Sequence, residues 1–102
     1  MGNLFNLKGK TAWITGGKRI GQRVAEVLAE HGANIIISYN KSRKEAEEAT
    51  KKIKKYKTRA LLIQADVSSR QNVEEAVDEI KRHFNKIDIL ILMASVFEKA
   101  VK

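Results

Sequence analysis

Apolar side chains fall into two alternating patterns along this chain. Short, nearly continuous runs alternate with longer stretches in which apolar residues recur every three or four positions. Runs rich in β-branched residues are typical of strands covered on both faces, and the longer spacing is typical of amphipathic helices. Four runs therefore predict strands, over residues 11–15, 34–39, 60–64 and 87–93.

Three amphipathic stretches separate these runs and predict helices. The first ends at Gly32, because glycine readily adopts the left-handed conformation that closes a helix. The second and third begin with the spacing of a capping box, in Ser42 with Glu45 and in Ser68 with Gln71. The expected buried faces comprise Val24, Ala25, Leu28 and Ala29, then Ala46, Ala49, Ile53 and Tyr56, then Val73, Ala76, Val77, Ile80 and Phe84.

The order strand-helix-strand, repeated to a fourth strand, predicts an α/β fold with a parallel sheet. Right-handed crossovers place the strands in the order 3-2-1-4, the first half of a doubly wound, Rossmann-like dinucleotide-binding fold with three crossover helices. We expect two helices on one face of the sheet and one on the other. The fourth strand is then an edge with an uncovered apolar flank, which favours self-association or pairing with a further segment.

The amino-acid composition excludes several kinds of functional site. The chain has 102 residues and no cysteine, which excludes disulfides, thiolate zinc sites and cysteine nucleophiles. Its two histidines, His31 and His83, both fall near predicted helix ends and argue against a metal site or a catalytic triad. No run approaches the roughly 18 apolar residues of a membrane span, and residues 1–6 lack the features of a signal peptide. We therefore expect a cytoplasmic protein without a membrane partner.

Charge leaves two interpretations open. The formal net charge is +8, and residues 51–57 form the one dense basic cluster. Lysines at the end of a helix complement its dipole and are usually solvated. A nucleic-acid patch is the alternative, but aromatic residues make up only 6% and are not interleaved with the basic ones. The sequence therefore does not favour a nucleic-acid partner.

A glycine-containing turn joins the first predicted strand to the first predicted helix. The first N–H groups of a helix lack helical partners, and the helix dipole adds partial positive charge there. Glycines also occur in turns that bind nothing, but this position in a βαβ unit favours a phosphate site. The candidate pyrophosphate-binding residues are Gly16, Gly17, Lys18, Arg19, Ile20 and Gly21.

The end of the second predicted strand bears on the choice of dinucleotide. An acidic residue about 20 positions beyond the glycines recognises the free ribose 2′-hydroxyl of NAD. Residues 39–43 contain no carboxylate, whereas Asn40, Lys41 and Ser42, with Arg19, offer groups that hold a 2′-phosphate. This pattern favours NADP over NAD. The alternative is that Lys41 is an ordinary surface residue.

Together these segments resemble the N-terminal part of the short-chain dehydrogenase/reductase family. The likeness is nearest to its 3-oxoacyl-(acyl-carrier-protein) reductase and pteridine reductase types. It rests on residues 8–10, the glycine turn, the basic residues 40–42, Asp66 with Val67, and residues 87–95. The resemblance implies a single NAD(P)-binding domain over residues 1–102, truncated relative to the family. The family reaction is hydride transfer between NADP(H) and a carbonyl or alcohol substrate.

The resemblance also assigns roles beyond the turn. Asp66 and Val67 would contact the adenine ring, and Ala94 and Ser95 would border the cofactor beyond the fourth strand. Asp66 has a structural alternative, in which its carboxylate simply accepts backbone N–H bonds at the end of the third strand.

Three departures from the family pattern qualify this assignment. The glycine turn is one residue shorter, and Leu92 with Met93 replaces the asparagine pair that precedes Ala94 in the family. Neither Tyr39 nor Tyr56 is followed by lysine four positions later, so the Tyr-x-x-x-Lys pair is absent, as is its active-site serine. We therefore expect no catalytic residues and no turnover by this chain alone. A non-enzymatic nucleotide-sensing or protein-interaction module stays open as the alternative function.

Overall fold

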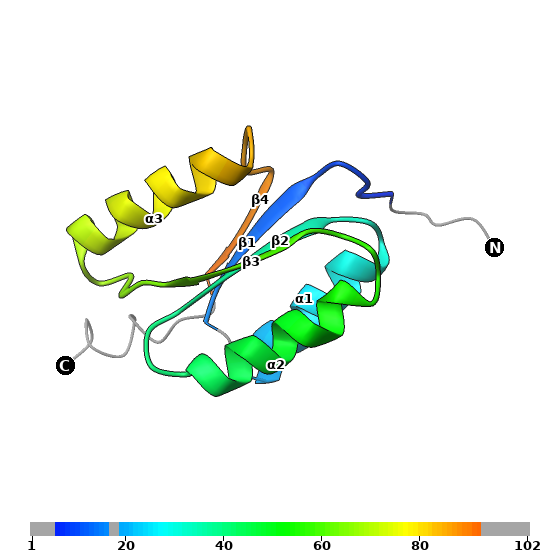
Figure 1. Ribbon diagram of the computed structural model, residues 1–102, viewed down its shortest axis with the longest axis horizontal. Coiled ribbons are helices and arrows are strands. Elements are labelled where there is room, and N and C mark those ends of the chain that lie inside the picture. Colours follow the sequence, from blue (N-terminus) through cyan, green and yellow to red (C-terminus); the bar gives the residue numbers. More distant parts are fainter. Residues whose placement is uncertain (1–5, 17–18, 93–102) are drawn as a thin grey trace.

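The computed structural model of the protein describes residues 6–16 and 19–92, and contains four strands and three helices in strict alternation (Figure 1). In chain order the elements are β1 (Thr11–Thr15), α1 (Arg19–Glu30), β2 (Asn34–Tyr39), α2 (Arg43–Lys54), β3 (Ala60–Gln64), α3 (Arg70–His83) and β4 (Ile89–Leu92).

The strands form one parallel sheet in the order β3-β2-β1-β4, which confirms the predicted topology. The first three strands have their predicted bounds, whereas β4 is shorter than the predicted run over residues 87–93. Ile87 and Asp88 precede the ladder because Asp88 exchanges hydrogen bonds with the first residue of β1, Thr11, instead of extending β4. Met93 lies outside the described residues.

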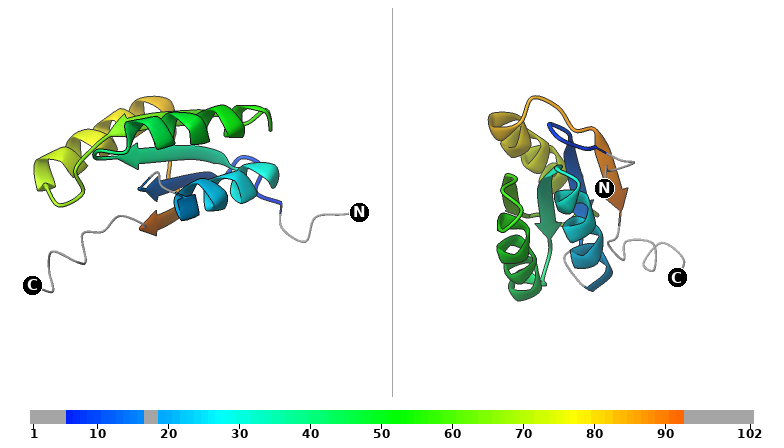
Figure 2. Two further views of the ribbon diagram at one scale, coloured as in Figure 1. Left: turned by 90° about the horizontal axis from the view of Figure 1, so that it is seen from below. Right: turned by 90° about the vertical axis from the view of Figure 1, so that its right-hand side faces the viewer.

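Helices cover the two faces of the sheet unequally, as predicted. Helices α1 and α2 lie side by side on one face, and α3 lies on the other (Figures 1 and 2). Alternating strand residues divide between the two cores, so that Ile35 and Ile37 face α1 and α2 while Ile36 faces α3. None of these three helices is long and apolar enough to cross a membrane.

Trp13 is a core residue on the α3 face and is only 6% exposed. Its indole Nε1 donates to the Ser38 hydroxyl at 2.9 Å, which satisfies the polar end of a buried ring. The bond crosses from β1 to β2, and the Ser38 carbonyl in turn accepts the N–H of Gly16 at 2.8 Å. The core therefore fixes the start of the glycine turn.

Helix ends confirm one expectation and correct two. Gly32 closes α1 with φ of 102° in the left-handed region. Ser69, not the predicted Ser68, caps α3 by accepting the N–H of Asn72, because the Ser68 hydroxyl is bound to Asp66. Ser42 precedes α2 as expected, but its ψ of 54° departs from the extended conformation of a cap and its side chain makes no capping bond.

Strand β4 is an edge of the sheet (Figure 2), and its apolar side chains are only partly buried. Ile89 and Ile91 pack against the core beneath α1 and α2. Leu90 and Leu92 point to the opposite face and are 55% and 72% exposed. The predicted uncovered apolar flank is therefore confirmed.

Asp88 joins the amino-terminal ends of β1 and β4. Its carboxylate accepts the N–H of Thr11 at 2.9 Å and lies 3.3 Å from the Nζ of Lys86. The Thr11 hydrogen bond, followed by the interaction with Lys86, lowers the pKa of Asp88 from its usual value. In the sequence, Asp88 belongs to the segment that resembles the family, and no neighbouring residue indicates its bond to Thr11.

The Asp88 carboxylate predicts a pH-dependent stability. Because its pKa is lowered on folding, its contribution is complete above the ordinary aspartate pKa of about 3.9 and is lost as pH falls through the folded value. The midpoint of urea unfolding should be lower for Asp88→Asn than for the unmodified protein at pH 7, and the two should converge below pH 4. A gap that stays constant over this range would contradict the assigned role.

Candidate functional site

Three loops with candidate binding residues meet at one edge of the sheet. Because the strands are parallel, the turn after β1, the 40–42 loop after β2 and the 66–69 loop after β3 all lie at their carboxyl ends. Strand order reverses direction between β1 and β4, and ligands of doubly wound sheets bind in the crevice outside such a switch point. The structure therefore brings together the described parts of the predicted site.

The glycine turn approaches α1 so closely that no side chain fits between them. A Cβ atom on Gly21 would lie 2.4 Å from the carbonyl oxygen of Gly16, and Gly16 has φ of 95°. Helix α1 therefore begins directly against the end of β1, with no acidic residue in its first turn. An anionic group outside this turn would meet unpaired N–H groups and the positive end of the helix dipole.

Ile20 lies in the first turn of α1 and is 66% exposed. A large apolar side chain beside a polar turn gains from the loss of water when a ligand covers it. The predictions for Gly17, Lys18, Ala94 and Ser95 lie outside the described residues, as does the side chain of Arg19.

The loop after β2 presents one positive charge that the described structure leaves without an ion pair. Lys41 is exposed, whereas Arg43 binds Glu47 of the same helix at 3.2 Å. That hydrogen bond raises the pKa of Arg43, and the negative charge of Glu47 offsets the positive charge of Arg43. The Ser42 hydroxyl, which caps no helix, lies beside Lys41. Lys41 and Ser42 are thus the groups of this loop suited to a phosphate.

Asp66 is held in place by the start of α3. Its Oδ1 accepts the backbone N–H of Ser68 at 2.9 Å and the Ser68 hydroxyl at 2.6 Å. The N–H of Asp66 donates to Oδ1 of Asn72 at 3.1 Å. The structural alternative for Asp66 is therefore confirmed for one carboxylate oxygen, while its contact with adenine, like that of the half-buried Val67, stays a prediction.

Two residues that support these loops were missed by sequence reasoning. Asn72 binds the backbone of Asp66, and Gln64 Nε2 donates to the carbonyl of Asn40 at 3.3 Å. Gln64 thereby ties the end of β3 to the loop after β2. The pair Ser69 and Asn72 has the same spacing as Ser68 and Gln71, so sequence spacing alone offered two registers for the start of α3.

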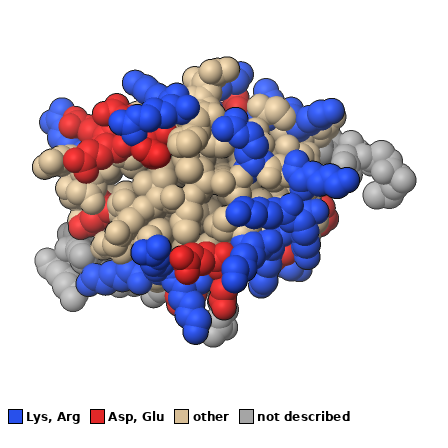
Figure 3. Space-filling model, in the orientation of Figure 1, with Lys and Arg blue, Asp and Glu red and all other residues tan. Residues whose placement is uncertain are grey.

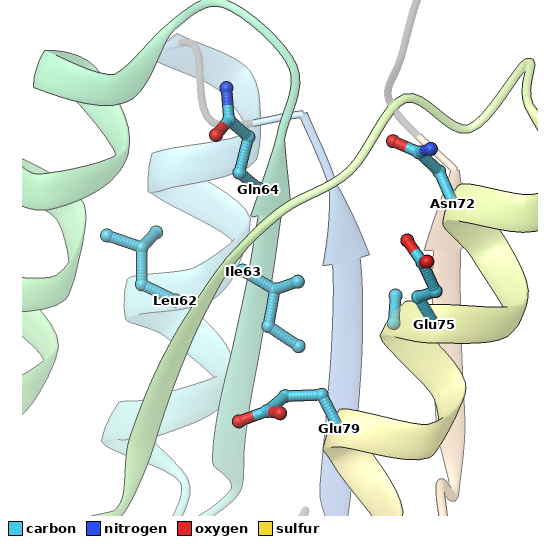
Figure 4. A pocket seen from close by; sticks show the side chains of 7 residues that line it. Leu62, Ile63, Gln64, Asn72, Glu75 and Glu79 are labelled. Atoms are coloured by element: carbon cyan, nitrogen blue, oxygen red, sulfur yellow. The ribbon is translucent and has the colours of Figure 1, made fainter.

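An open groove of about 310 Å³ lies between β3 and α3 (Figure 4). Glu75 and Glu79 contribute carboxylates to its lining, and Glu79 also binds Arg82 and His83. Two carboxylates oppose the binding of a dinucleotide's phosphates, so this groove is not the candidate site. Its lining comprises Leu62, Ile63, Gln64, Asn72, Glu75, Ala76 and Glu79.

Comparisons with known proteins agree with this geometry. The family model for short chain dehydrogenases matches residues 10–102. Hydroxynaphthalene reductase arp2 of Aspergillus fumigatus is 41% identical over 86 residues, which are 83% of this chain and 32% of that protein. The chain belongs to the short-chain dehydrogenase family and spans about a third of the length of the curated relatives it matches.

Among the solved structures of similar proteins, some contain NADP and others contain NAD⁺. A short-chain dehydrogenase from Burkholderia cenocepacia in complex with NADP superimposes with a TM-score of 0.77 at 40% identity, over 84% of this chain and 36% of that one. NAD⁺-bound xylitol dehydrogenase gives a TM-score of 0.78 at 34% identity, over 82% of this chain and 32% of that one. The fold alone therefore does not distinguish NADP from NAD.

Replacement of Gly21 by alanine tests the close approach of α1 to β1. Helix propensity alone would make Gly21→Ala more stable, by about 0.5–1 kcal/mol. The contact with Gly16 should reverse this sign, because overpacking at a rigid backbone contact costs about 1–3 kcal/mol. Urea unfolding measures the difference, and Arg23→Ala, an exposed change in the same helix, should stay within about 0.5 kcal/mol. A Gly21→Ala protein more stable than the unmodified one would refute the contact.

Proposed function

We propose that this chain is the dinucleotide-binding portion of a short-chain reductase that prefers NADP(H). When bound, NADPH would supply a hydride to a carbonyl substrate, and NADP⁺ would accept one from an alcohol, as in the family reaction. The turn at Gly16 and Gly21 would hold the pyrophosphate, Asp66 and Val67 the adenine, and residues 40–42 the ribose phosphate. Ala94 and Ser95 would border the remainder of the cofactor.

The observation that carries the NADP preference is the composition of the loop after β2. In this loop Lys41 forms no ion pair with a described residue, and the Ser42 hydroxyl forms no capping hydrogen bond. No carboxylate occurs from residue 39 to residue 43. A carboxylate there would repel a 2′-phosphate, whereas a charge-assisted hydrogen bond to one is worth about 1.5–3 kcal/mol. The same basic loop supports a likeness to the 3-oxoacyl-(acyl-carrier-protein) and pteridine reductase types.

A non-enzymatic module on the same fold is the second candidate function. It is favoured by Leu92 and Met93 at the positions of the family's asparagines. Such a module would sense a nucleotide or bind a protein.

Calorimetric titration with both nucleotides tests the NADP preference. One or two charge-assisted contacts predict that NADP binds about ten- to a hundredfold more tightly than NAD. Lys41→Glu should erase or invert this ratio, because the new carboxylate repels the 2′-phosphate. Lys44→Glu, the same charge change in the first turn of α2, should leave the ratio within about twofold.

Three results of this titration would contradict the proposal. Equal affinities for NADP and NAD in the unmodified protein would refute the role of the loop after β2. An unchanged ratio in Lys41→Glu would refute the role of that residue. Absence of binding by either nucleotide at millimolar concentration would favour the protein-interaction module.

We also infer that the apolar flank of β4 mediates self-association of the 102-residue protein. Leu90 and Leu92 leave an exposed apolar surface on a strand whose outer edge pairs with no other described strand. The alternative occupant of this flank is a carboxyl-terminal segment of the kind present in the longer relatives.

Sedimentation equilibrium tests the role of this flank. The unmodified protein should form dimers or larger species at micromolar concentration. Leu92→Lys should shift it to monomer, because the substitution places a charge on the exposed flank. Val27→Lys, a matched change at a 46% exposed position of α1, should leave the association unchanged. A monomeric unmodified protein would overturn the inference.

A further inference from the structure

Positive charge concentrates at the edge of the sheet opposite the candidate dinucleotide site. The strands begin at this edge and all three helices end there, because helices and strands alternate in direction. We define the basic edge as residues 8–10, 30–33, 51–59 and 79–88. Lys and Arg side chains gather over the right-hand and lower right part of the molecule, where α2 ends (Figure 3).

The excess of positive over negative residues on the basic edge accounts for the whole net charge of the protein. The basic edge contains eleven of the 20 Lys and Arg residues but only three of the 12 Asp and Glu residues. Its excess of eight positive charges equals the formal net charge of +8, so the remaining residues are balanced. A surface evolved only for solubility would have no reason to place the whole excess on one edge.

Helix dipoles explain only part of this distribution. Basic residues in the last turns of α2 and α3 stabilise the negative ends of those helices. Lys8, Lys10, Arg59 and Lys86 lie instead in loops that lead into strands, outside the last turns of the helices. Of these, Lys8 packs against Gly32 at the end of α1, and Arg59 stacks on Phe84 at the end of α3. Lys57 also adopts a left-handed φ of 62°, a conformation that favours glycine.

The loops of the basic edge are bound to one another through their backbones. The Leu7 N–H donates to the His31 carbonyl, and the Asn34 N–H to the Lys10 carbonyl, both at 2.8 Å. The side chain of Asn34 accepts the Arg59 N–H at 3.0 Å. Together with the Asp88 bond to β1, these contacts hold the first residues of the four strands in a row. At the usual spacing of neighbouring strands, this row is about 14 Å long.

Few of these cations are neutralised locally. Within residues 6–16 and 19–92, ion pairs at this edge join Arg82 to Glu79 and Lys86 to Asp88. Arg59 stacks on the ring of Phe84 at 4.3 Å, which leaves its charge intact. The edge therefore presents several free positive charges in a preorganised row, which reduces the entropy lost on binding an extended anion.

We propose that the basic edge binds the phosphate backbone of nucleic acid without sequence preference. A duplex carries one negative charge per about 1.7 Å of its axis, so a row of this length faces several phosphates. The low aromatic content argues against base stacking, but backbone binding does not require it. An anionic membrane is the less suitable partner, because membrane-surface binding also needs exposed apolar side chains. At the described basic edge, Phe84 is buried and Ile87 is the one exposed large apolar residue.

Fluorescence anisotropy with a fluorescein-labelled 20-base-pair duplex of mixed sequence tests this site. Binding should weaken as salt is raised from about 50 to 200 mM, with a slope of log K against log salt of about −0.9 per contacted phosphate. The triple variant Lys8→Gln, Lys54→Gln, Lys57→Gln should reduce the steepness of this slope by about 2.7 and the affinity at least about tenfold.

A matched triple variant separates location from total charge. Arg23→Gln, Lys44→Gln and Arg70→Gln remove the same three charges from outside the basic edge, and should change the affinity less than about threefold. Saturating NADP should not displace the duplex, because the two sites lie at opposite edges of the sheet. This result is independent of whether NADP is the cofactor.

Four outcomes would overturn the proposal. They are no binding at 50 mM salt with about 0.1 mM protein, an equal loss in both triple variants, displacement by NADP, or binding to vesicles containing phosphatidylserine but not to the duplex. Circular dichroism of both variants verifies that each retains its helices.

Discussion

The close approach of α1 to the end of β1 is the constraint on which the candidate site depends. Because Gly21 has no side chain, the first turn of the helix lies directly against the carbonyl of Gly16. Any Cβ atom at this point would push the helix away from the sheet. The N–H groups at the start of α1 would then no longer lie against the end of β1, and the candidate anion site would lose its geometry.

Hydrogen bonds to the backbone also hold the loops in place at both ends of the sheet. At the carboxyl ends, Ser38, Gln64 and Asn72 hold the turn and the two neighbouring loops through hydrogen bonds. At the amino-terminal ends, Asn34 and Asp88 tie the loops together. Two rigid surfaces result, one with the geometry of a dinucleotide crevice and one with a row of positive charge. A β-sheet between two helical layers keeps these surfaces apart.

The topology could be predicted from the sequence because the spacing of apolar residues reflects which faces of each strand and helix are buried. Strands covered on both faces, such as β2 with its three consecutive isoleucines, cannot be mistaken for amphipathic helices. Local capping was less predictable. Ser68 and Ser69 have equivalent spacing to a following polar side chain, and only the Asp66 carboxylate decides which serine caps α3. The structural role of Asp88 was not predicted, because its partner, Thr11, is 77 residues away in the sequence.

Binding of NADP followed by two-dimensional ¹H–¹⁵N NMR tests the central claim most directly, because each described loop reports separately. Amide signals of Gly16, Gly21, Lys41 and Asp66 should shift on titration, whereas signals from residues 51–59 should not. Shifts confined to residues 51–59, with the signals of Gly16 and Gly21 unchanged, would place the nucleotide on the basic edge and contradict the site at the carboxyl ends of the strands.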